Sequence, residues 1–185
     1  MNIHAPKRMT VDEYLAWATG QPGRYELIDG VVREMSPEKV GHVEGKITAY
    51  MALKSAIKRA EVACFVLSDG ATVRISKDTA FEPDALVYPG PRANADSLEI
   101  PNPLIVVEVG SPSTHKYDAG FKLNGYMSLP SLQHVLLVNA ATKVVVHLKK
   151  RGAGPEFEST TLTSGMLRLD PPGLEIPAED FFAID

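Results

Sequence analysis

The sequence predicts an α/β or α+β domain built around a mixed β-sheet, and three observations support this fold class. The chain has 185 residues, enough for one domain with an apolar core and too few for two comfortable ones. Its expected elements follow the order helix, hairpin, helix, strands, helix, strands. The run "LIVVEV" at residues 104–109 is apolar on both faces, which is typical of a central strand covered on both sides.

The composition excludes several classes of protein. Hydrophobic residues make up 44% and charged residues 23% of the chain, as in ordinary globular proteins. No apolar run approaches the roughly 18–20 residues that cross a bilayer, and we find no secretory signal, so we expect a cytoplasmic protein. The lone Cys64 excludes an internal disulfide and a cysteine-based zinc site. The net charge of −4 argues against a protein that coats nucleic acid, although an enzyme can contact a phosphate backbone locally.

The N-terminal part begins with a helix and a hairpin. Thr10 starts the helix, because "TVDE" forms a capping box, and "GQPG" ends it. The "DG" pair in "YELIDGVV" predicts a two-residue hairpin, in a register that places Leu27 opposite Val32 and Glu26 opposite Arg33.

A second helix is expected over residues 37–60, followed by another "DG" hairpin. Apolar residues recur along this helix at helical spacing, which predicts an amphipathic element. These residues are Val40, Val43, Ile47 and Tyr50/Met51.

Strands are then expected over residues 81–88 and 104–109, joined by a loop rich in proline and asparagine. A helix follows from Ser113 to about Ser128, although Gly120 and Gly125 each disfavour it by roughly 1 kcal/mol. A strand, a turn and a strand come next, and short strands and a helical turn at Pro177 close the chain.

Two acidic residues interrupt the apolar strands. A buried Glu108 must take up a proton or find a cation, because an isolated buried carboxylate is costly. Asp84 follows Pro83, which cannot join a ladder and therefore marks a sheet edge or a bulge. Two carboxylates that face one cleft would repel each other unless a cation lay between them, and all-oxygen ligation favours Mg²⁺ or Mn²⁺ over zinc.

Each of these residues could also have a purely structural role. Asp84 could cap a turn. Ordinary ion pairs would account for three more residues: Glu108 with Arg74, Lys122 with Asp118, and Glu26 with Arg33. The combination of an aspartate after a proline, a glutamate in a buried strand and a lysine on the next helix is what favours a functional site.

This combination resembles the PD-(D/E)XK nuclease superfamily, and in particular its Uma-type family of proposed restriction endonucleases. The similar blocks are "MTVDEYL", "YELIDGVV", "MSPEKVGH", "FEPDALVYPG", "VVEVGSPSTHKYDAGFKLNGY" and "HVLLVN", from about Met9 to Leu148. The resemblance implies a restriction-endonuclease-like mixed sheet flanked by helices, with extra N-terminal and C-terminal hairpins, in a single domain over residues 1–185.

The resemblance also implies a set of site residues. Asp84 matches the aspartate of "PD" and Glu108 the "(D/E)", so that both, with the backbone carbonyl of Val109, are expected to hold Mg²⁺ or Mn²⁺. Many superfamily members carry a lysine two residues after the glutamate, where this chain has Gly110. As in the Uma-type pattern, Lys122 on the next helix takes its place and is expected to orient or deprotonate the attacking water.

Further residues carry weaker expectations. Glu26 and His42 match recurrent family positions without a derived role. Gly110 departs from the family, which usually has an aliphatic residue there, and "HVLLVN" replaces an aromatic-rich segment. Contacts with a nucleic-acid backbone could come from two basic groups, although solvated element ends explain both more simply. The groups are Lys54, Lys58 and Arg59, and residues 149–151.

The function that the resemblance implies is Mg²⁺-dependent endonuclease cleavage of DNA, leaving a 5′-phosphate. A non-catalytic DNA- or protein-binding descendant of the same fold is the first alternative, and a small-molecule hydrolase the second. A homodimer is expected, because two cuts on a duplex suit two-fold symmetry.

Overall fold

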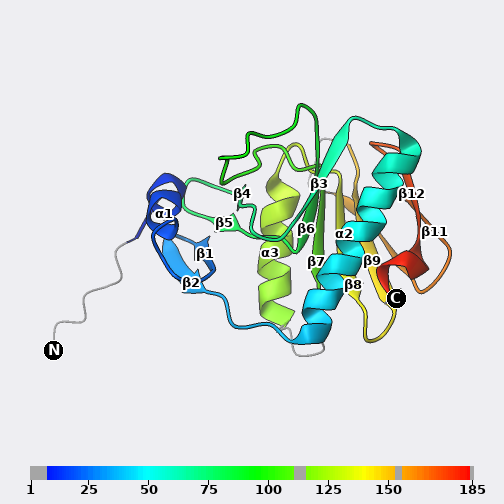
Figure 1. Cartoon of the computed structure of the whole chain (residues 1–185), viewed down its shortest axis with the longest axis horizontal. Helices are drawn as coiled ribbons and strands as arrows, with labels where there is room; N and C mark the ends of the chain where they lie inside the picture. Colours follow the sequence, from blue (N-terminus) through cyan, green and yellow to red (C-terminus); the bar gives the residue numbers. More distant parts are fainter. Residues whose placement is uncertain (1–7, 111–115, 153–155, 184–185) are drawn as a thin grey trace.

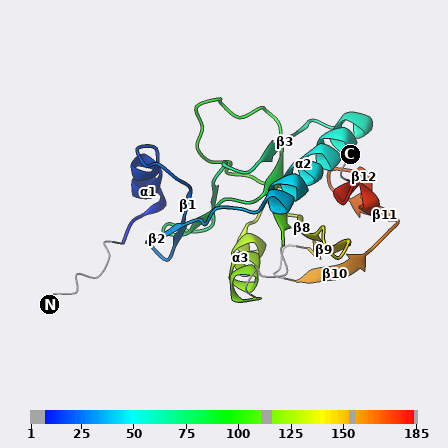
Figure 2. The same ribbon diagram turned by 60° about the horizontal axis from the view of Figure 1, so that its bottom comes forward.

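The computed structural model describes residues 8–110, 116–152 and 156–183. Its centre is a six-stranded mixed sheet with the strand order β10-β9-β8-β7-β6-β3, in which β7 and β8 are parallel and the other pairs antiparallel. Its strands are β3 (Cys64–Ser68), β6 (Ala85–Pro89), β7 (Ile105–Val109), β8 (His134–Asn139), β9 (Val144–Lys150) and β10 (Phe157–Leu162). Helix α2 (Val40–Ala60) covers one face and α3 (Lys116–Ser128) the other (Figure 1, Figure 2).

Smaller elements extend the core at both ends. Helix α1 (Val11–Ala18) packs on a second sheet of order β2-β1-β5-β4, and the hairpin β11–β12 with the 3₁₀ helix η1 packs near α2. The bounds are β1 (Tyr25–Ile28), β2 (Val31–Glu34), β4 (Val73–Arg74), β5 (Ala80–Phe81), β11 (Met166–Leu169), β12 (Leu174–Pro177) and η1 (Ala178–Phe181). The predicted mixed sheet with helices on its faces and a hairpin at each end is confirmed. None of the helices in the described part of the chain has the length and apolar character needed to cross a membrane.

The local signals of the N-terminal part are confirmed. The Thr10 hydroxyl accepts a hydrogen bond from the Glu13 N–H, and Glu13 Oε2 accepts one from the Thr10 N–H at 2.8 Å. Asp29 and Gly30 both have positive φ, as the predicted two-residue hairpin requires. The predicted pairs Leu27 with Val32 and Glu26 with Arg33 are present.

The expected single strand over residues 81–88 is instead two strands. β5 ends at Phe81 in the four-stranded sheet, and β6 begins at Ala85 in the six-stranded sheet. Pro83 lies between them, at the point where the chain leaves one sheet for the other, because its ring nitrogen cannot donate to either ladder. The proline therefore marks a change of sheet and places Asp84 at the start of the central β6.

The apolar residues that recur along the second helix lie on its exposed side, whereas an amphipathic helix usually buries its apolar side. The helix begins at Val40 rather than residue 37, and its apolar residues face outward: Val40 is 75% and Ile47 57% exposed. We call Val40, Val43, Ile47 and Met51 the α2 stripe. The buried side consists mostly of small residues, among them Gly45 and Ala49. A Cβ atom on Gly45 would lie 2.9 Å from Val109 Cγ1, so this face allows the helix to lie close against β7.

The two helical glycines of α3 give a matched prediction. A Cβ atom on Gly125 would lie 2.7 Å from Phe81 Cε2, whereas one on Gly120 would meet nothing within 4 Å. We expect Gly125→Ala to lower the free energy of unfolding by about 1–2 kcal/mol, because overpacking outweighs the better helix propensity. Gly120→Ala should raise it by about 0.5–1 kcal/mol. Urea unfolding of the two variants measures both effects, and equal signs would contradict the close packing of α3 on Phe81.

Two buried histidines form a hydrogen-bonded pair beneath the C-terminal hairpin. The carbonyl of Pro171 accepts from His134 Nε2 at 2.9 Å, so His134 Nδ1 is left as the acceptor for His147 Nε2–H, also at 2.9 Å. Both rings are therefore neutral. Burial is the largest cause that lowers the pKa of each histidine from 6.5 to about 4.

This pair predicts a loss of stability in mild acid. The unfolded chain takes up protons below pH 6.5 that the folded pair refuses until about pH 4, so the stability is complete above pH 6.5 and falls as the pH decreases. We expect a loss of about 2 kcal/mol per histidine between pH 7 and pH 5. His147→Gln should remove roughly half of this loss in urea unfolding. An identical loss in the variant would show that other groups cause it.

Candidate active site

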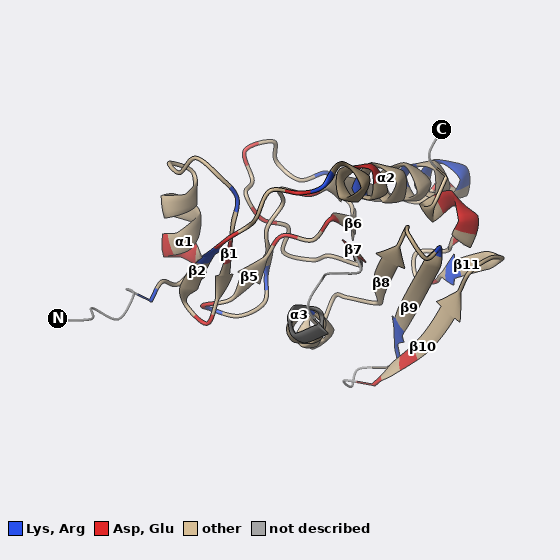
Figure 3. Ribbon diagram, turned by 90° about the horizontal axis from the view of Figure 1, so that it is seen from below, with Lys and Arg blue, Asp and Glu red and all other residues tan. Residues whose placement is uncertain are grey.

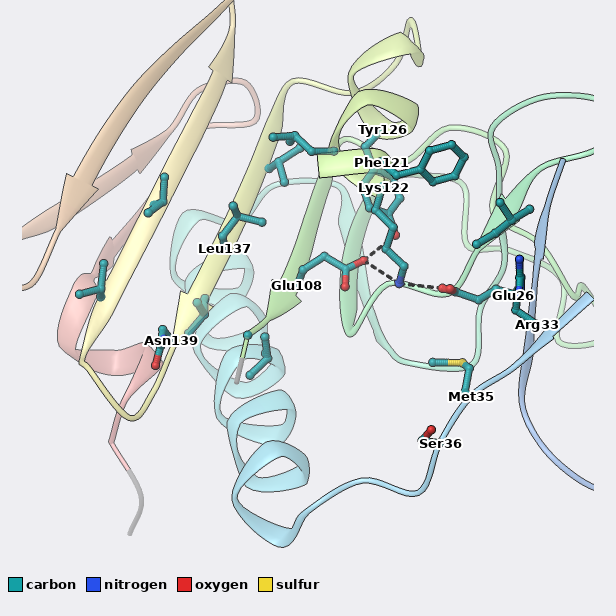
Figure 4. A pocket seen from close by; sticks show the side chains of 18 of the residues that line it. Glu26, Arg33, Met35, Ser36, Glu108, Phe121, Lys122, Tyr126, Leu137 and Asn139 are labelled. Carbon is teal, nitrogen blue, oxygen red and sulfur yellow. Dashed lines mark hydrogen bonds and ion pairs between the residues drawn. The ribbon is translucent and has the colours of Figure 1, made fainter. Parts of the chain in front are cut away.

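Glu108 lies at the end of β7 on the face that α3 covers. Alternation along the strand sends Ile105, Val107 and Val109 into the α2 side of the core, and Val106 and Glu108 to the other side. The Tyr126 hydroxyl of α3 donates to Glu108 Oε1 at 2.7 Å. Lys122 Nζ lies 3.4 Å from the same oxygen (Figure 4).

Lys122 bridges two carboxylates from different parts of the fold. Its Nζ lies 2.7 Å from Glu26 Oε1 on β1 and 3.4 Å from Glu108 Oε1 on β7. Glu26 is itself fixed, because its Oε1 accepts the Glu82 N–H at 3.0 Å. The expected partner Asp118 lies outside the residues whose side chains the structure describes. Through Glu26 and Glu108, Lys122 connects the N-terminal hairpin with the central sheet.

The alternative ion pairs of the acidic residues do not form. Glu26 lies opposite Arg33 in the hairpin, but its carboxylate contacts Lys122. Arg33 has no ion-pair partner within the described residues. Arg74 binds Asp12 and Glu99, not Glu108.

The charge balance around Glu108 is incomplete. Burial raises its pKa to about 7, with repulsion from Asp84 adding to the rise and Lys122 and Tyr126 opposing it. Burial alone would lower the pKa of Lys122, but Glu108 and Glu26 together raise it, so this amine stays protonated. Glu108 is thus a carboxylate in need of further positive charge.

Asp84 lies on the other side of the end of β7, facing α2. Its Oδ2 accepts the Val109 N–H at 2.6 Å. Its Oδ1 lies 3.1 Å from Lys46 Nζ and 3.7 Å from His42 Nε2, both on α2. Burial would raise the pKa of Asp84, but the neighbouring His42 and the charge of Lys46 outweigh it and lower the pKa. The expected His42 therefore lies beside Asp84.

Sequence reasoning missed the buried Lys46, which is 3% exposed. Besides Asp84, it contacts Glu38 and, at 2.9 Å, Asp69 Oδ2. Arg24 continues this network, with 2.7 Å to Asp69 and a further contact with Glu82. A lysine in register with the small residues of α2 is the signal that could have identified it. Tyr126, also missed, is the tyrosine of "KLxxY".

Two overlapping groups of residues could hold a cation. Glu38, His42 and Asp84 each offer a ligand atom within 4.8 Å of one another. Lys46 already contacts both carboxylates of this group, so a metal ion there would have to compete with an ammonium ion. Asp84 and Glu108 form the second group. Within the described residues no hydrogen bond or ion pair occupies Glu108 Oε2, and the pair offers the hard oxygen ligands that Mg²⁺ and Mn²⁺ prefer.

Glu108 and Lys122 line a cleft of about 1030 Å³ between α3, the β1–β2 hairpin and the open face of β8 and β9 (Figure 4). Glu26 and Arg33 line it from the hairpin, and Val109 from β7. Asp84 is not among its lining residues; it lies behind Val109. The carboxylates of Glu108 and Asp84 thus lie on opposite faces of the sheet at the end of β7. Gly110, the residue after β7, also lines the cleft.

The basic groups expected to contact nucleic acid lie away from this cleft. Lys54 is twelve residues after His42 on α2, about 18 Å along the helix axis, and Arg59 donates to the Glu175 carbonyl. In the second group, Lys150 donates to the Leu129 carbonyl and Arg151 pairs with Glu158. Figure 3 shows both groups at the outer parts of α2 and β9. Their part in binding nucleic acid stays a prediction.

Comparison with known proteins assigns the chain to a family. The sequence model of the family described as "Uma2: Putative restriction endonuclease" matches residues 11–179. The chain belongs to the Uma2 family. The match covers most of the chain and confirms the resemblance seen in its sequence blocks.

Two individual proteins extend the comparison of this Uma2 member. "Uncharacterized protein slr1290" of Synechocystis sp. is 27% identical over 190 residues, covering 100% of this chain and 96% of the relative. The crystal structure of "a putative nuclease belonging to DUF820" from Anabaena variabilis superposes on this chain with a TM-score of 0.72 and 16% sequence identity. The aligned part covers 94% of this chain and 97% of the Anabaena chain. This likeness confirms the nuclease-like fold. The description of the family supports a nuclease.

Proposed function

We propose that this Uma2 member is a Mg²⁺- or Mn²⁺-dependent endonuclease that hydrolyses phosphodiester bonds of DNA. Two contacts at the end of β7 support the proposal: Glu108 lies 3.4 Å from Lys122, and Asp84 accepts the Val109 N–H. In this proposal, three residues far apart in the sequence supply hard oxygen ligands and a fixed cation to one site. The family of the chain supports the same activity.

Asp84, Glu108 and the backbone carbonyl of Val109 are the residues that would hold the metal ion. Such an ion lowers the pKa of water and neutralises charge on the phosphate. The protein fixes the ligands beforehand: Tyr126 holds Glu108, and the Val109 N–H holds Asp84. This preorganisation removes the need to reorganise the carboxylates during the reaction.

Lys122 is proposed to orient the attacking water and to stabilise the charge that develops on the phosphate. Its two carboxylate contacts are those of a protonated ammonium group, which can donate but cannot accept a hydrogen bond. Glu26 is a positioning residue in this scheme, because it holds Lys122 from the hairpin side. The water oxygen bonds to phosphorus and the bond from phosphorus to the 3′ oxygen breaks. The water gives one proton to the solvent, and the 3′ oxygen takes one up from the solvent.

The direct test is incubation of the pure protein with plasmid DNA. We expect cleavage with Mg²⁺ or Mn²⁺, none with EDTA, and product ends that carry a 5′-phosphate and can be joined by ligase. Cleavage that proceeds in EDTA, or ends that carry a 3′-phosphate, would contradict the proposal.

One observation favours the alternative of a non-catalytic DNA- or protein-binding descendant. Asp84 is already countered by Lys46 at 3.1 Å and does not line the cleft. A protein that served only as a scaffold would keep this balanced arrangement and would not respond to divalent metal ions. Metal binding therefore separates the two functions.

The proposal includes a homodimer, because two cuts on a DNA duplex suit two-fold symmetry. It also includes a cytoplasmic location, where the DNA substrate is found. The α2 stripe has the three- and four-residue spacing of a helix-pairing seam. Antiparallel pairing of two α2 helices about a two-fold axis would cover this stripe. Light scattering should then give twice the mass of one chain, and Ile47→Glu should give a monomer. A monomeric wild-type protein would contradict this pairing.

A further inference from the structure

We propose that the cleft beside Glu108 and Lys122 binds an unpaired nucleotide, so that single-stranded or locally unpaired DNA is preferred over an intact duplex. This inference rests on the proposed nuclease function and specifies the substrate class of the same site. The cleft volume of about 1030 Å³ is at the upper end of the roughly 300–1,000 Å³ typical of small-ligand sites, so it has room for a nucleotide.

The floor of the cleft is an open, apolar part of the central sheet. Strand pairing places Glu108, Leu137 and Val146 in one cross-strand row, and Asn139 and Val144 in the next. With strands about 4.8 Å apart, Val146 lies roughly 10 Å from Glu108. Leu137, Val144 and Val146 are half-buried and line the cleft. A base flipped out of its stack could lie on this floor while its phosphate stays near Glu108.

Phe121 provides a wall suited to a base. It lies on α3 next to Lys122, lines the cleft and is 41% exposed. The edge-to-face contact with Phe81, at 5.9 Å between centroids, fixes one side of the ring and leaves area for stacking. Stacking on an aromatic side chain contributes about 1–3 kcal/mol per base.

Asn139 adds a polar group at the far end of the floor. Its Oδ1 accepts the Thr142 N–H at 3.1 Å, which fixes the amide orientation. The Nδ2 group keeps both donors for an acceptor on a base edge. An apolar floor with one oriented amide fits a base better than a phosphate chain.

The charges of the cleft argue against a duplex held by its two backbones. Glu26, Glu34 and Glu108 line the described cleft together with two cations, Arg33 and Lys122. Lys122 shares its charge with Glu26 and Glu108, so among the described residues Arg33 is the cation of the cleft that has no ion-pair partner. Duplex binding usually depends on many lysine and arginine contacts with phosphates. Affinity must therefore come mainly from the base.

The test measures binding without cleavage. Fluorescence anisotropy in EDTA compares a labelled 20-nucleotide single strand with its duplex. We expect at least tenfold tighter binding of the single strand, and a shallow salt dependence that corresponds to one or two phosphates. Phe121→Ala should weaken single-strand binding about tenfold, and Val146→Thr, which keeps the shape of the floor, severalfold.

Met166→Ala is the matched control, because Met166 is 47% exposed on β11 and does not line the cleft. It should leave binding unchanged, and thermal unfolding checks that each variant is folded. Equal or tighter duplex binding, or an unchanged affinity in Phe121→Ala, would overturn the inference. The proposed function fails separately: single-strand binding without metal-dependent cleavage would remove the nuclease and keep the nucleotide site.

Discussion

Replacement of either carboxylate of the proposed metal site should abolish cleavage. We expect Asp84→Asn and Glu108→Gln to lower the rate of Mg²⁺-dependent plasmid cleavage at least 100-fold, because each removes a charged ligand from a preorganised site. Both variants keep nearly the native shape. The neutral amide of Glu108→Gln can still accept from Tyr126, whose hydroxyl lies 2.7 Å from Glu108 Oε1, so that loss of activity would reflect loss of charge.

The matched control for these variants is Asp96→Asn, an exposed acidic residue in the loop before β7. Its activity should equal that of the wild type. Gel analysis of supercoiled, nicked and linear plasmid gives the rates. Cleavage that persists in both site variants would mean a contaminating nuclease or a different active site.

Of the substitutions proposed for this protein, removal of the buried amine of Lys46 should cause the largest loss of stability. Its Nζ contacts Glu38, Asp69 and Asp84, and the side chain is almost inaccessible to solvent. We expect Lys46→Met to lower the free energy of unfolding by about 3–5 kcal/mol, because it leaves the buried Asp84 without its ammonium partner and takes one of two cations from Glu38 and Asp69. Urea unfolding at pH 7 measures this loss.

Two further variants separate charge from packing. Lys58→Met removes an exposed lysine from the same helix and should change stability by less than about 0.5 kcal/mol. Asp84→Asn, added to Lys46→Met, should restore part of the lost stability, since it removes a buried charge that has lost its ammonium partner. A loss that is equal for Lys46→Met and Lys58→Met, or a double variant that is less stable than Lys46→Met, would contradict the charge-based explanation.

Local rules were sufficient for the elements whose structure depends on a few neighbouring residues. The capping box at Thr10 and the hairpin at Asp29 and Gly30 are satisfied within four or five residues, so the sequence predicts them directly. Glu108 was found in the same way, because a carboxylate inside an apolar strand needs a special environment. Its contact with Lys122 agrees with the expected grouping of the two residues.

Features that depend on how distant segments pack could not be predicted. The apolar α2 stripe was the strongest periodic signal of its helix, yet the small residues around Gly45 are buried, because they let α2 approach Val109 closely. Because the apolar stripe suggested the wrong buried side of α2, the buried Lys46 was also missed. The position of Asp84 behind β7 depends on the change of sheet at Pro83, which only the arrangement of the two sheets determines.

The most direct test of the proposed metal site is calorimetric titration of the protein with Mg²⁺ or Mn²⁺. We predict one site per chain in the wild type, lost in Asp84→Asn and in Glu108→Gln but retained in Glu38→Gln. Binding that survives in Glu108→Gln and disappears in Glu38→Gln would place the ion in the Glu38, His42 and Asp84 cluster, and would contradict the assignment of Asp84 and Glu108 as its ligands.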